Sequence, residues 1–176
     1  MHIVTAMKRP ILLTLALTIL VPVFAHAQYN SVGLFVGGTQ ELEDGFDFSI
    51  DESALEIFWE TKLERGTSLR LQYGAFDTAV VVEGVSGSGS LDYLDVVASY
   101  EFDEVWGRTA ILGGLGVYRQ DLGTVDEDAW GLTLGVNGSF PVTRRFAALT
   151  ELAYHWADFD ENASYFILKA GFRVSF

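Results

Sequence analysis

Histidine is the side chain best suited to transfer protons near neutral pH, and beyond residue 27 the chain has one, His155. Its neighbours read His155-Trp156-Ala157, so no serine stands two residues away to act as a nucleophile. The chain also contains no cysteine. A hydroxyl or thiol paired with a histidine is the usual requirement of nucleophilic hydrolases. We therefore predict that the chain is not an enzyme and that His155 forms hydrogen bonds inside the fold.

Acidic side chains are the second group with possible chemistry. The chain has 24 Asp and Glu residues, and 14 of them fall in four stretches that contain no Lys or Arg. Mg²⁺ and Ca²⁺ prefer carboxylate oxygens, but no stretch has the spacing of a dedicated calcium loop. We predict weak divalent-cation binding at Asp126, Glu127 and Asp128, with acids that only hydrate a surface as the alternative. The 14 acids are Glu41, Glu43, Asp44, Asp47, Asp51, Asp77, Glu83, Asp121, Asp126, Glu127, Asp128, Asp158, Asp160 and Glu161.

A glycine-rich segment, Gly84-Val-Ser-Gly-Ser-Gly-Ser90, has the composition of a phosphate-binding loop. It lacks the Lys-Ser/Thr pair and the following helix that such a loop requires. We interpret it as a flexible loop.

Composition narrows the class of protein further. With a net charge of −13, the chain has too few basic side chains to neutralise a row of phosphates, so we predict no nucleic-acid partner. The absence of cysteine excludes disulfides and cysteine-based zinc sites, and we predict no cofactor. A hydrophobic fraction of 49 % is high for so acidic a chain of 176 residues. The apolar residues must therefore be concentrated in particular segments.

Residues 1–27 have the three parts of a secretory signal peptide. Lys8-Arg9 precedes an uncharged, mostly apolar stretch of 14 residues, 11–24, and Ala25-His26-Ala27 follows it. We predict cleavage after Ala27, which leaves residues 28–176 as one domain. An uncleaved anchor is the alternative, but a bilayer needs about 20 apolar residues in a helix. Met7 is an alternative initiator to Met1.

Beyond residue 27, apolar side chains recur at every second position in eight segments. The last is the clearest, because Phe166, Leu168, Ala170, Phe172 and Val174 fall on one face of a strand. Each segment approaches the 9–11 residues of a tilted membrane-spanning strand. The connections alternate between long and short. The long ones lie near residues 39–51, 77–90, 121–128 and 157–164, and the short ones near 62–66, 103–108 and 141–145.

Aromatic residues fall at both ends of these segments, as in the girdles of outer-membrane barrels. We predict an all-β fold, an eight-stranded antiparallel up-and-down transmembrane β-barrel, in preference to a soluble sandwich. The aromatic residues at one end are Trp59, Trp106, Phe140, Phe146 and Phe176, and those at the other are Trp130, Trp156 and Phe166.

Several charged residues fall on the opposite faces of the same segments, which face the barrel interior. An eight-stranded barrel is just wide enough for side chains to fill its lumen. Buried charges must be paired, because stranding one partner costs about 3–5 kcal/mol. We predict a hydrogen-bonded cluster that plugs the barrel. Its members are Glu56, Glu60, Arg70, Glu101, Glu151, Lys169 and Arg173.

The final segment, residues 165–176, ends in Phe176, and Gly113-Gly-Leu-Gly-Val-Tyr118 is a glycine-rich strand. With the signal peptide and eight strands, these features resemble the small outer-membrane barrels of Gram-negative bacteria, the OmpA transmembrane domain and the OmpX-like proteins. The resemblance covers residues 28–176 and implies that the barrel-assembly machinery reads Phe176. The lipid A deacylases of this fold carry a His-x-Ser arrangement, which is absent at His155.

The resemblance places the chain in the cell outer membrane, with the long acidic loops outside. We predict a non-enzymatic, monomeric outer-membrane protein with a structural or surface-interacting role. Its expected partners are outer-membrane lipid and lipopolysaccharide, whose phosphates divalent cations would bridge to the acids. A narrow porin-like channel or small-solute carrier is the alternative, and a lipid A-modifying enzyme is the third reading.

Deletion of Phe176 should impair barrel assembly more than Asp126→Asn does, because the terminal aromatic residue would serve as the assembly signal. The measurement is the folded fraction in isolated membranes, read from migration in detergent gels with and without boiling. Equal folded fractions for the two variants would argue against a terminal signal.

Overall fold

The computed structural model describes residues 29–41, 53–63, 66–82, 85–104, 107–121, 126–159 and 163–176. The predicted signal peptide, residues 1–27, lies outside these ranges. The strands are β1 (Tyr29–Glu41), β2 (Ser53–Lys62), β3 (Thr67–Val82), β4 (Val85–Glu104), β5 (Gly107–Asp121), β6 (Asp126–Pro141), β7 (Phe146–Ala157) and β8 (Ala163–Ser175). No helix in the described ranges is long and apolar enough to cross a membrane.

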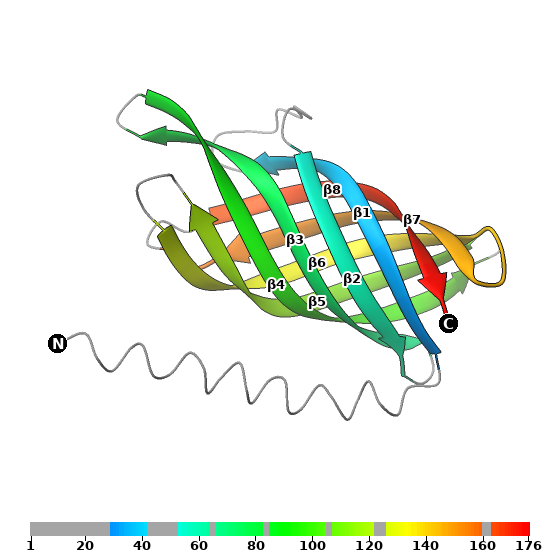
Figure 1. The fold of residues 1–176 in the computed structure, drawn as a ribbon. Helices are drawn as coiled ribbons and strands as arrows, with labels where there is room; N and C mark the ends of the chain where they lie inside the picture. The colour runs from blue at the N-terminus through cyan, green and yellow to red at the C-terminus, as the bar shows by residue number, and fades with distance from the viewer. Residues whose placement is uncertain are drawn as a thin grey trace.

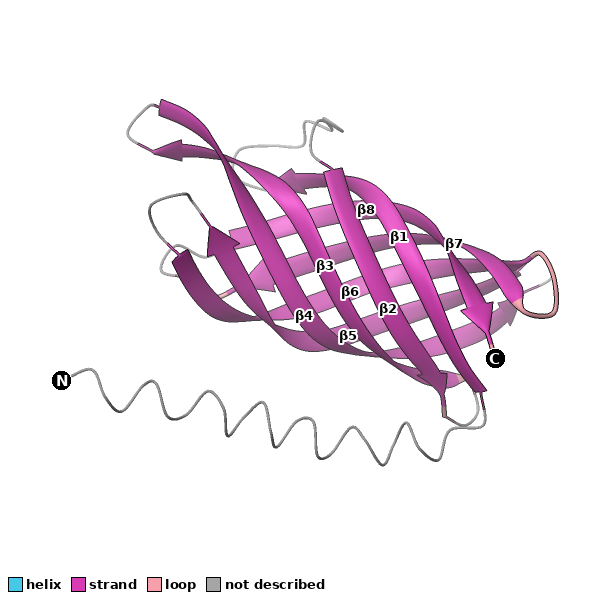
Figure 2. Ribbon diagram, viewed as in Figure 1, coloured by secondary structure: helices cyan, strands magenta, loops and turns pink. Residues whose placement is uncertain are grey.

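Each strand pairs antiparallel with its neighbours in sequence, and β1 also pairs with β8 (Figures 1 and 2). This confirms the predicted closed, up-and-down, eight-stranded barrel. At the seam Leu34 lies opposite Phe172, and the Phe176 amide donates to the Asn30 carbonyl oxygen at 2.9 Å. Both ends of the barrel chain therefore lie at the same rim, which we call the terminal rim.

Short turns join the strands at the terminal rim. The β2–β3 turn includes Gly66, whose φ of +82° is a conformation that glycine adopts at little cost. The Gly66 carbonyl oxygen accepts a hydrogen bond from the Glu101 amide at 2.8 Å, so the turn is tied to the end of β4.

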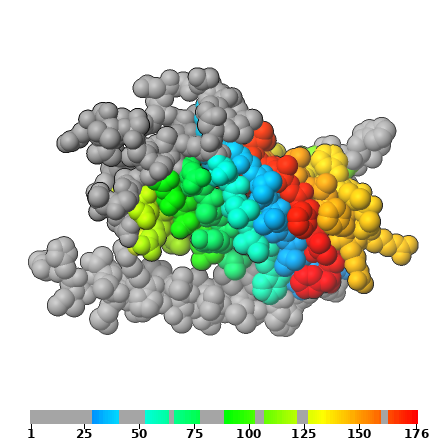
Figure 3. All heavy atoms as spheres, turned by 45° about the horizontal axis from the view of Figure 1, so that its top comes forward, coloured from blue at the N-terminus to red at the C-terminus, as the bar shows by residue number. Residues whose placement is uncertain are grey.

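The outer wall of the barrel is apolar, as the alternating pattern predicted. Leu115 is 60 % exposed and Ile57 is 57 % exposed, whereas Phe35 and Ile167, on inner faces, are fully buried. Side chains of β8, β1 and β2 pack side by side on one face (Figure 3). Exposed outward-facing residues include Val32, Val36, Leu55, Tyr73, Leu94, Ile111, Val117, Leu132, Leu134, Val136, Leu152, Leu168 and Val174.

Exposed and half-buried aromatic side chains lie near both ends of this wall. Trp130 and Trp156 pack edge to face with ring centroids 5.2 Å apart. Toward the terminal rim, the rings of Phe146 and Phe172 stack at 5.8 Å. Trp59, Phe140 and Phe176 are also exposed, and Trp106 lies outside the described residues.

Two connections predicted to be long loops are largely strand. β3 continues to Val82 and β4 begins at Val85, with these two residues opposite each other. The flexible-loop interpretation of Gly84–Ser90 is therefore wrong for residues 85–90, because β-branched valines favour strand and small Ser and Gly residues pair opposite them. This hairpin extends beyond both neighbouring strands (Figure 1). Likewise, Asp121 ends β5 opposite Asp126, the first residue of β6, so only residues 122–125 separate the two strands.

Candidate functional site

Six charged side chains from β2, β3, β7 and β8 form one connected row inside the barrel, which we call the charge ladder. Its order is Glu56, Lys169, Glu151, Arg70, Glu60 and Arg173. The successive nitrogen–oxygen distances are 2.5, 2.8, 2.7, 3.3 and 2.6 Å. Acids and bases alternate along the row, and three of each make its net charge zero.

The register of the sheet supplies two of these contacts directly. Glu151 lies opposite Lys169 on β7 and β8, and Glu60 lies opposite Arg70 on β2 and β3. The Arg70–Glu151 contact crosses the lumen from β3 to β7. All six side chains are buried, so the ion pairs replace water as partners of these groups.

Contacts between β8 and β2 must pass over β1, which lies between them. Lys169 reaches Glu56 in this way, and its β1 neighbour in the register is Gly37. A Cβ atom at Gly37 would overlap the Leu168 carbonyl oxygen and would lie 2.9 Å from the Lys169 Cα. A side chain at Gly37 would therefore displace the strand that carries Lys169.

Two phenylalanines support the cations of the ladder. The Arg70 guanidinium lies 4.5 Å from the ring centroid of Phe58, and the Lys169 ammonium lies 5.3 Å from that of Phe35. The two rings are 5.3 Å apart. Ring faces attract cations most strongly where water is excluded, which accounts for buried aromatic residues in a polar lumen.

Three uncharged residues add hydrogen bonds to the ladder. Tyr93 donates to Glu56 at 2.6 Å, and the Asn137 amide donates to Glu151 at 3.1 Å. Ser139 accepts a hydrogen bond from Arg173 at 3.2 Å. Sequence reasoning missed these partners, although strand parity places all three on inward faces.

Glu101 was predicted with the cluster but lies apart from it, near the terminal rim. Its carboxylate pairs with Lys62 at 2.9 Å and with Arg108 at 2.8 Å. The Arg108 side chain is 45 % exposed, so this pairing is weaker than those of the ladder.

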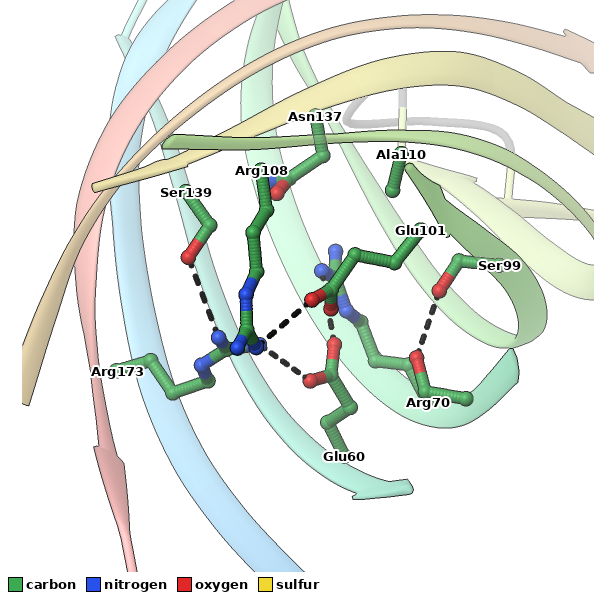
Figure 4. Close-up of a pocket in the computed structure, with 10 residues that line it drawn as sticks. Glu60, Arg70, Ser99, Glu101, Arg108, Ala110, Asn137, Ser139 and Arg173 are labelled. Carbon is green, nitrogen blue, oxygen red and sulfur yellow. Dashed lines mark hydrogen bonds and ion pairs between the residues drawn. The ribbon is translucent and has the colours of Figure 1, made fainter. Parts of the chain in front are cut away.

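A small cavity lies between Glu101 and the ladder (Figure 4). Its volume is about 10 Å³, which is room for about one water molecule. Arg108 and Arg173 line it together with Glu60 and Glu101. Beside the ladder, this cavity therefore has room for about one water molecule among four charged side chains.

Aromatic and aliphatic side chains fill the other half of the lumen. Tyr118 and Tyr165 are almost fully buried, and Phe159, from the β7–β8 connection, is 5 % exposed. Phe76 packs edge to face on Tyr165 with ring centroids 5.0 Å apart. This apolar plug comprises Ala54, Phe76, Leu91, Tyr93, Tyr118, Ala157, Phe159, Ala163, Tyr165 and Ile167.

Four polar side chains form a further group, which shares Tyr118 with the plug and which we call the hydroxyl cluster. It consists of Asp95 on β4, Tyr118 on β5, Thr133 on β6 and His155 on β7, and all four are buried. The Tyr118 hydroxyl lies 2.9 Å from His155 Nδ1 and 3.1 Å from Asp95 Oδ2. His155 thus forms hydrogen bonds in the interior.

Asp126, Glu127 and Asp128 lie on strand β6 and not in a loop. Neighbouring strand residues point to opposite faces, so Glu127 and Asp128 do not share one. The described part of the chain contains no group of three or more His, Cys, Asp or Glu side chains placed to hold a metal. Weak cation binding stays a prediction, and several of the acids lie outside the described residues. Those are Glu43, Asp44, Asp47, Asp51, Glu83, Asp160 and Glu161.

No protein-family model matches the chain, and neither does any curated protein. Solved structures do match. Neisserial surface protein A is 17 % identical with a TM-score of 0.60, over 84 % of this chain and 96 % of that one. The N-terminal barrel domain of Pseudomonas aeruginosa OprF is 17 % identical with a TM-score of 0.54, over 83 % and 97 %.

A third solved structure, a major outer membrane protein from Thermus thermophilus, is 12 % identical with a TM-score of 0.52. The match covers 85 % of this chain and 100 % of that one. At such identities the likeness concerns the fold alone. That fold is the small eight-stranded outer-membrane β-barrel that the sequence predicted.

Glu151→Ala should destabilise the barrel by about 3–5 kcal/mol, because it leaves Arg70 and Lys169 with one carboxylate partner fewer in the interior. Changing Glu151 and Lys169 together should cost less than the sum of the single changes, since both charges then disappear. Urea unfolding in detergent micelles measures both effects. Asp158→Ala, at an exposed position, is the control and should stay within about 0.5 kcal/mol of wild type. Additive costs for the double variant would contradict the pairing.

Proposed function

We propose that this chain is an integral outer-membrane protein with a sealed barrel, without enzymatic activity, and with a structural or surface-interacting role. The observation that carries the proposal is the filled lumen, in which a neutral charge ladder is continued by an apolar plug. The exposed apolar wall supports a membrane location, because such a surface is suited to contact lipid chains. The fold shared with outer-membrane barrels supports the same location.

The orientation follows from the two ends of the barrel. Short turns and the chain terminus occupy one rim, as is usual for the periplasmic side of outer-membrane barrels. The opposite end would then face outward, with the acidic connections and the β3–β4 hairpin. Divalent cations bridging these acids to lipopolysaccharide phosphates remain part of the proposal, as do recognition of Phe176 by the assembly machinery and a monomeric state.

A channel is disfavoured by the same filled lumen. A conducting pore needs a continuous wet path, but the cavity beside the ladder holds about one water molecule. Passage of an ion through the lumen would require breaking buried ion pairs, and a buried charge that loses its partner is costly.

Catalysis is disfavoured by the position of His155. Its side chain is fully buried, with Tyr118 and Thr133 against Nδ1, and Ala157 stands two residues further along the strand. A lipid substrate would have no access to this imidazole without disruption of the plug.

Cell fractionation tests the location. The protein should be recovered in the outer membrane, and its gel migration should change on boiling, because a folded barrel resists detergent at room temperature. Recovery of the folded protein as a soluble periplasmic species would contradict the proposal.

Planar-bilayer recording tests the sealed lumen. Wild-type protein, inserted at single-molecule density, should give no stable unitary currents, because the ladder and plug leave no wet path. A known porin inserted in the same membrane serves as the positive control. Large and steady currents from the wild-type barrel would support the channel alternative.

A further inference from the structure

Asp95 poses a charge problem that the ladder does not solve. The side chain is fully buried, and no Lys or Arg in the described chain pairs with it; the nearest basic atom is His155 Nδ1, 3.8 Å from Oδ2. The three cations of the ladder already balance its three carboxylates. An isolated buried carboxylate is costly, and such groups are commonly neutralised by taking up a proton.

Close contacts connect the four members of the hydroxyl cluster. Tyr118 Oη lies 3.1 Å from Asp95 Oδ2, 2.9 Å from Thr133 Oγ1 and 2.9 Å from His155 Nδ1. Thr133 Oγ1 also contacts Asp95 Oδ2 and lies 3.2 Å from His155 Nδ1. A neutral His155 with its ring proton on Nδ1 would donate to Tyr118, Tyr118 to Thr133 and Thr133 to Asp95, but this arrangement leaves the Asp95 carboxylate charged.

One additional proton neutralises the cluster. With the additional proton on the ring, His155 is an imidazolium, and its Nδ1 donates to Tyr118, Tyr118 to Thr133, and Thr133 to Asp95. With the proton on the carboxyl group, the same three hydrogen bonds run in the opposite direction. Either arrangement removes the unbalanced charge.

Among the described residues around the cluster, no cation is left to balance Asp95. The charge of Lys169 acts on both Asp95 and His155, but Lys169 is paired with Glu56 and Glu151 within the ladder. Gln72, whose amide nitrogen lies 3.5 Å from Asp95 Oδ2, carries no charge. The titratable and charged groups around the cluster are Tyr93 on β4, Tyr165 and Lys169 on β8, Glu56 on β2 and Glu151 on β7.

We propose that Asp95 and His155 form a buried proton-binding site that holds one proton, shared through Tyr118 and Thr133. In the unfolded chain, water solvates both groups, and above about pH 7 neither an ordinary Asp nor an ordinary His carries this proton. The folded state then binds one proton more than the unfolded state. Its stability falls as the pH rises, because unfolding releases that proton.

Spectroscopy of the full-length wild-type protein tests the site directly. With ¹⁵N-labelled histidine at pH 7, His155 should show either an imidazolium ring, or a neutral ring accompanied by the infrared carbonyl band of a protonated carboxyl group. His155→Gln identifies the ring signal, and Asp95→Asn should abolish the infrared band. A neutral His155 with no band lost in Asp95→Asn would overturn the proposal.

The pH dependence of unfolding is the second test. Between pH 7 and 8 the unfolding equilibrium constant of wild type should rise about tenfold, the change expected for one released proton. Asp95→Asn should flatten this dependence, because the amide keeps hydrogen-bonding atoms but has no charge to neutralise. Asp92→Asn, on the outer face of the same strand, is the matched control and should keep the wild-type slope. A flat wild-type profile, or an unchanged slope in Asp95→Asn, would contradict the shared proton.

Discussion

Side chains, and not solvent, must balance the charges buried inside this barrel, and much of the structure follows from that constraint. Apolar side chains form the outer wall, so the polar and charged side chains of the strands point inward. Inside, there is little room for water, and each charge needs a partner from another strand. The ladder meets this need because its acids and bases alternate over four strands. Asp95 is not part of this balance. Its charge can be neutralised only with the help of the residues around it, which are Tyr118, Thr133 and His155.

Close packing is the second constraint, because a lumen of eight strands has little room. Large inward side chains lie over glycines on the neighbouring strand. A Cβ at Gly74 would overlap the Tyr93 ring, and one at Gly116 would overlap Asp95 Oδ1. Gly116 belongs to the glycine-rich strand β5, so its lack of a side chain gives the carboxylate of the hydroxyl cluster its place.

Strand parity was sufficient to predict much of this from the sequence. The period of two distinguished the outward-facing from the lumen-facing residues, and it placed Glu151 and Lys169 on neighbouring strands. It did not show which acid meets which base across the lumen, since that depends on shear and side-chain reach. Glu101 therefore pairs near the terminal rim and not within the ladder. The length of the β3–β4 hairpin was also missed, because acidic and Gly-Ser composition suggested a loop where valines pair as strand.

The ladder also bears on the order in which the molecule assembles. Glu56 and Lys169 are 113 residues apart, as are Glu60 and Arg173, so these contacts form only when the last strand reaches the first ones. A sheet that lacked β8 would hold three ladder carboxylates and one guanidinium, a surplus of two negative charges. Pairing of β8 with β1 adds Lys169 and Arg173, whose charges balance that surplus. Pairing of β8 thus stabilises the closed barrel electrostatically. A partly paired sheet is disfavoured by repulsion between its carboxylates as well as by its unpaired strand edges.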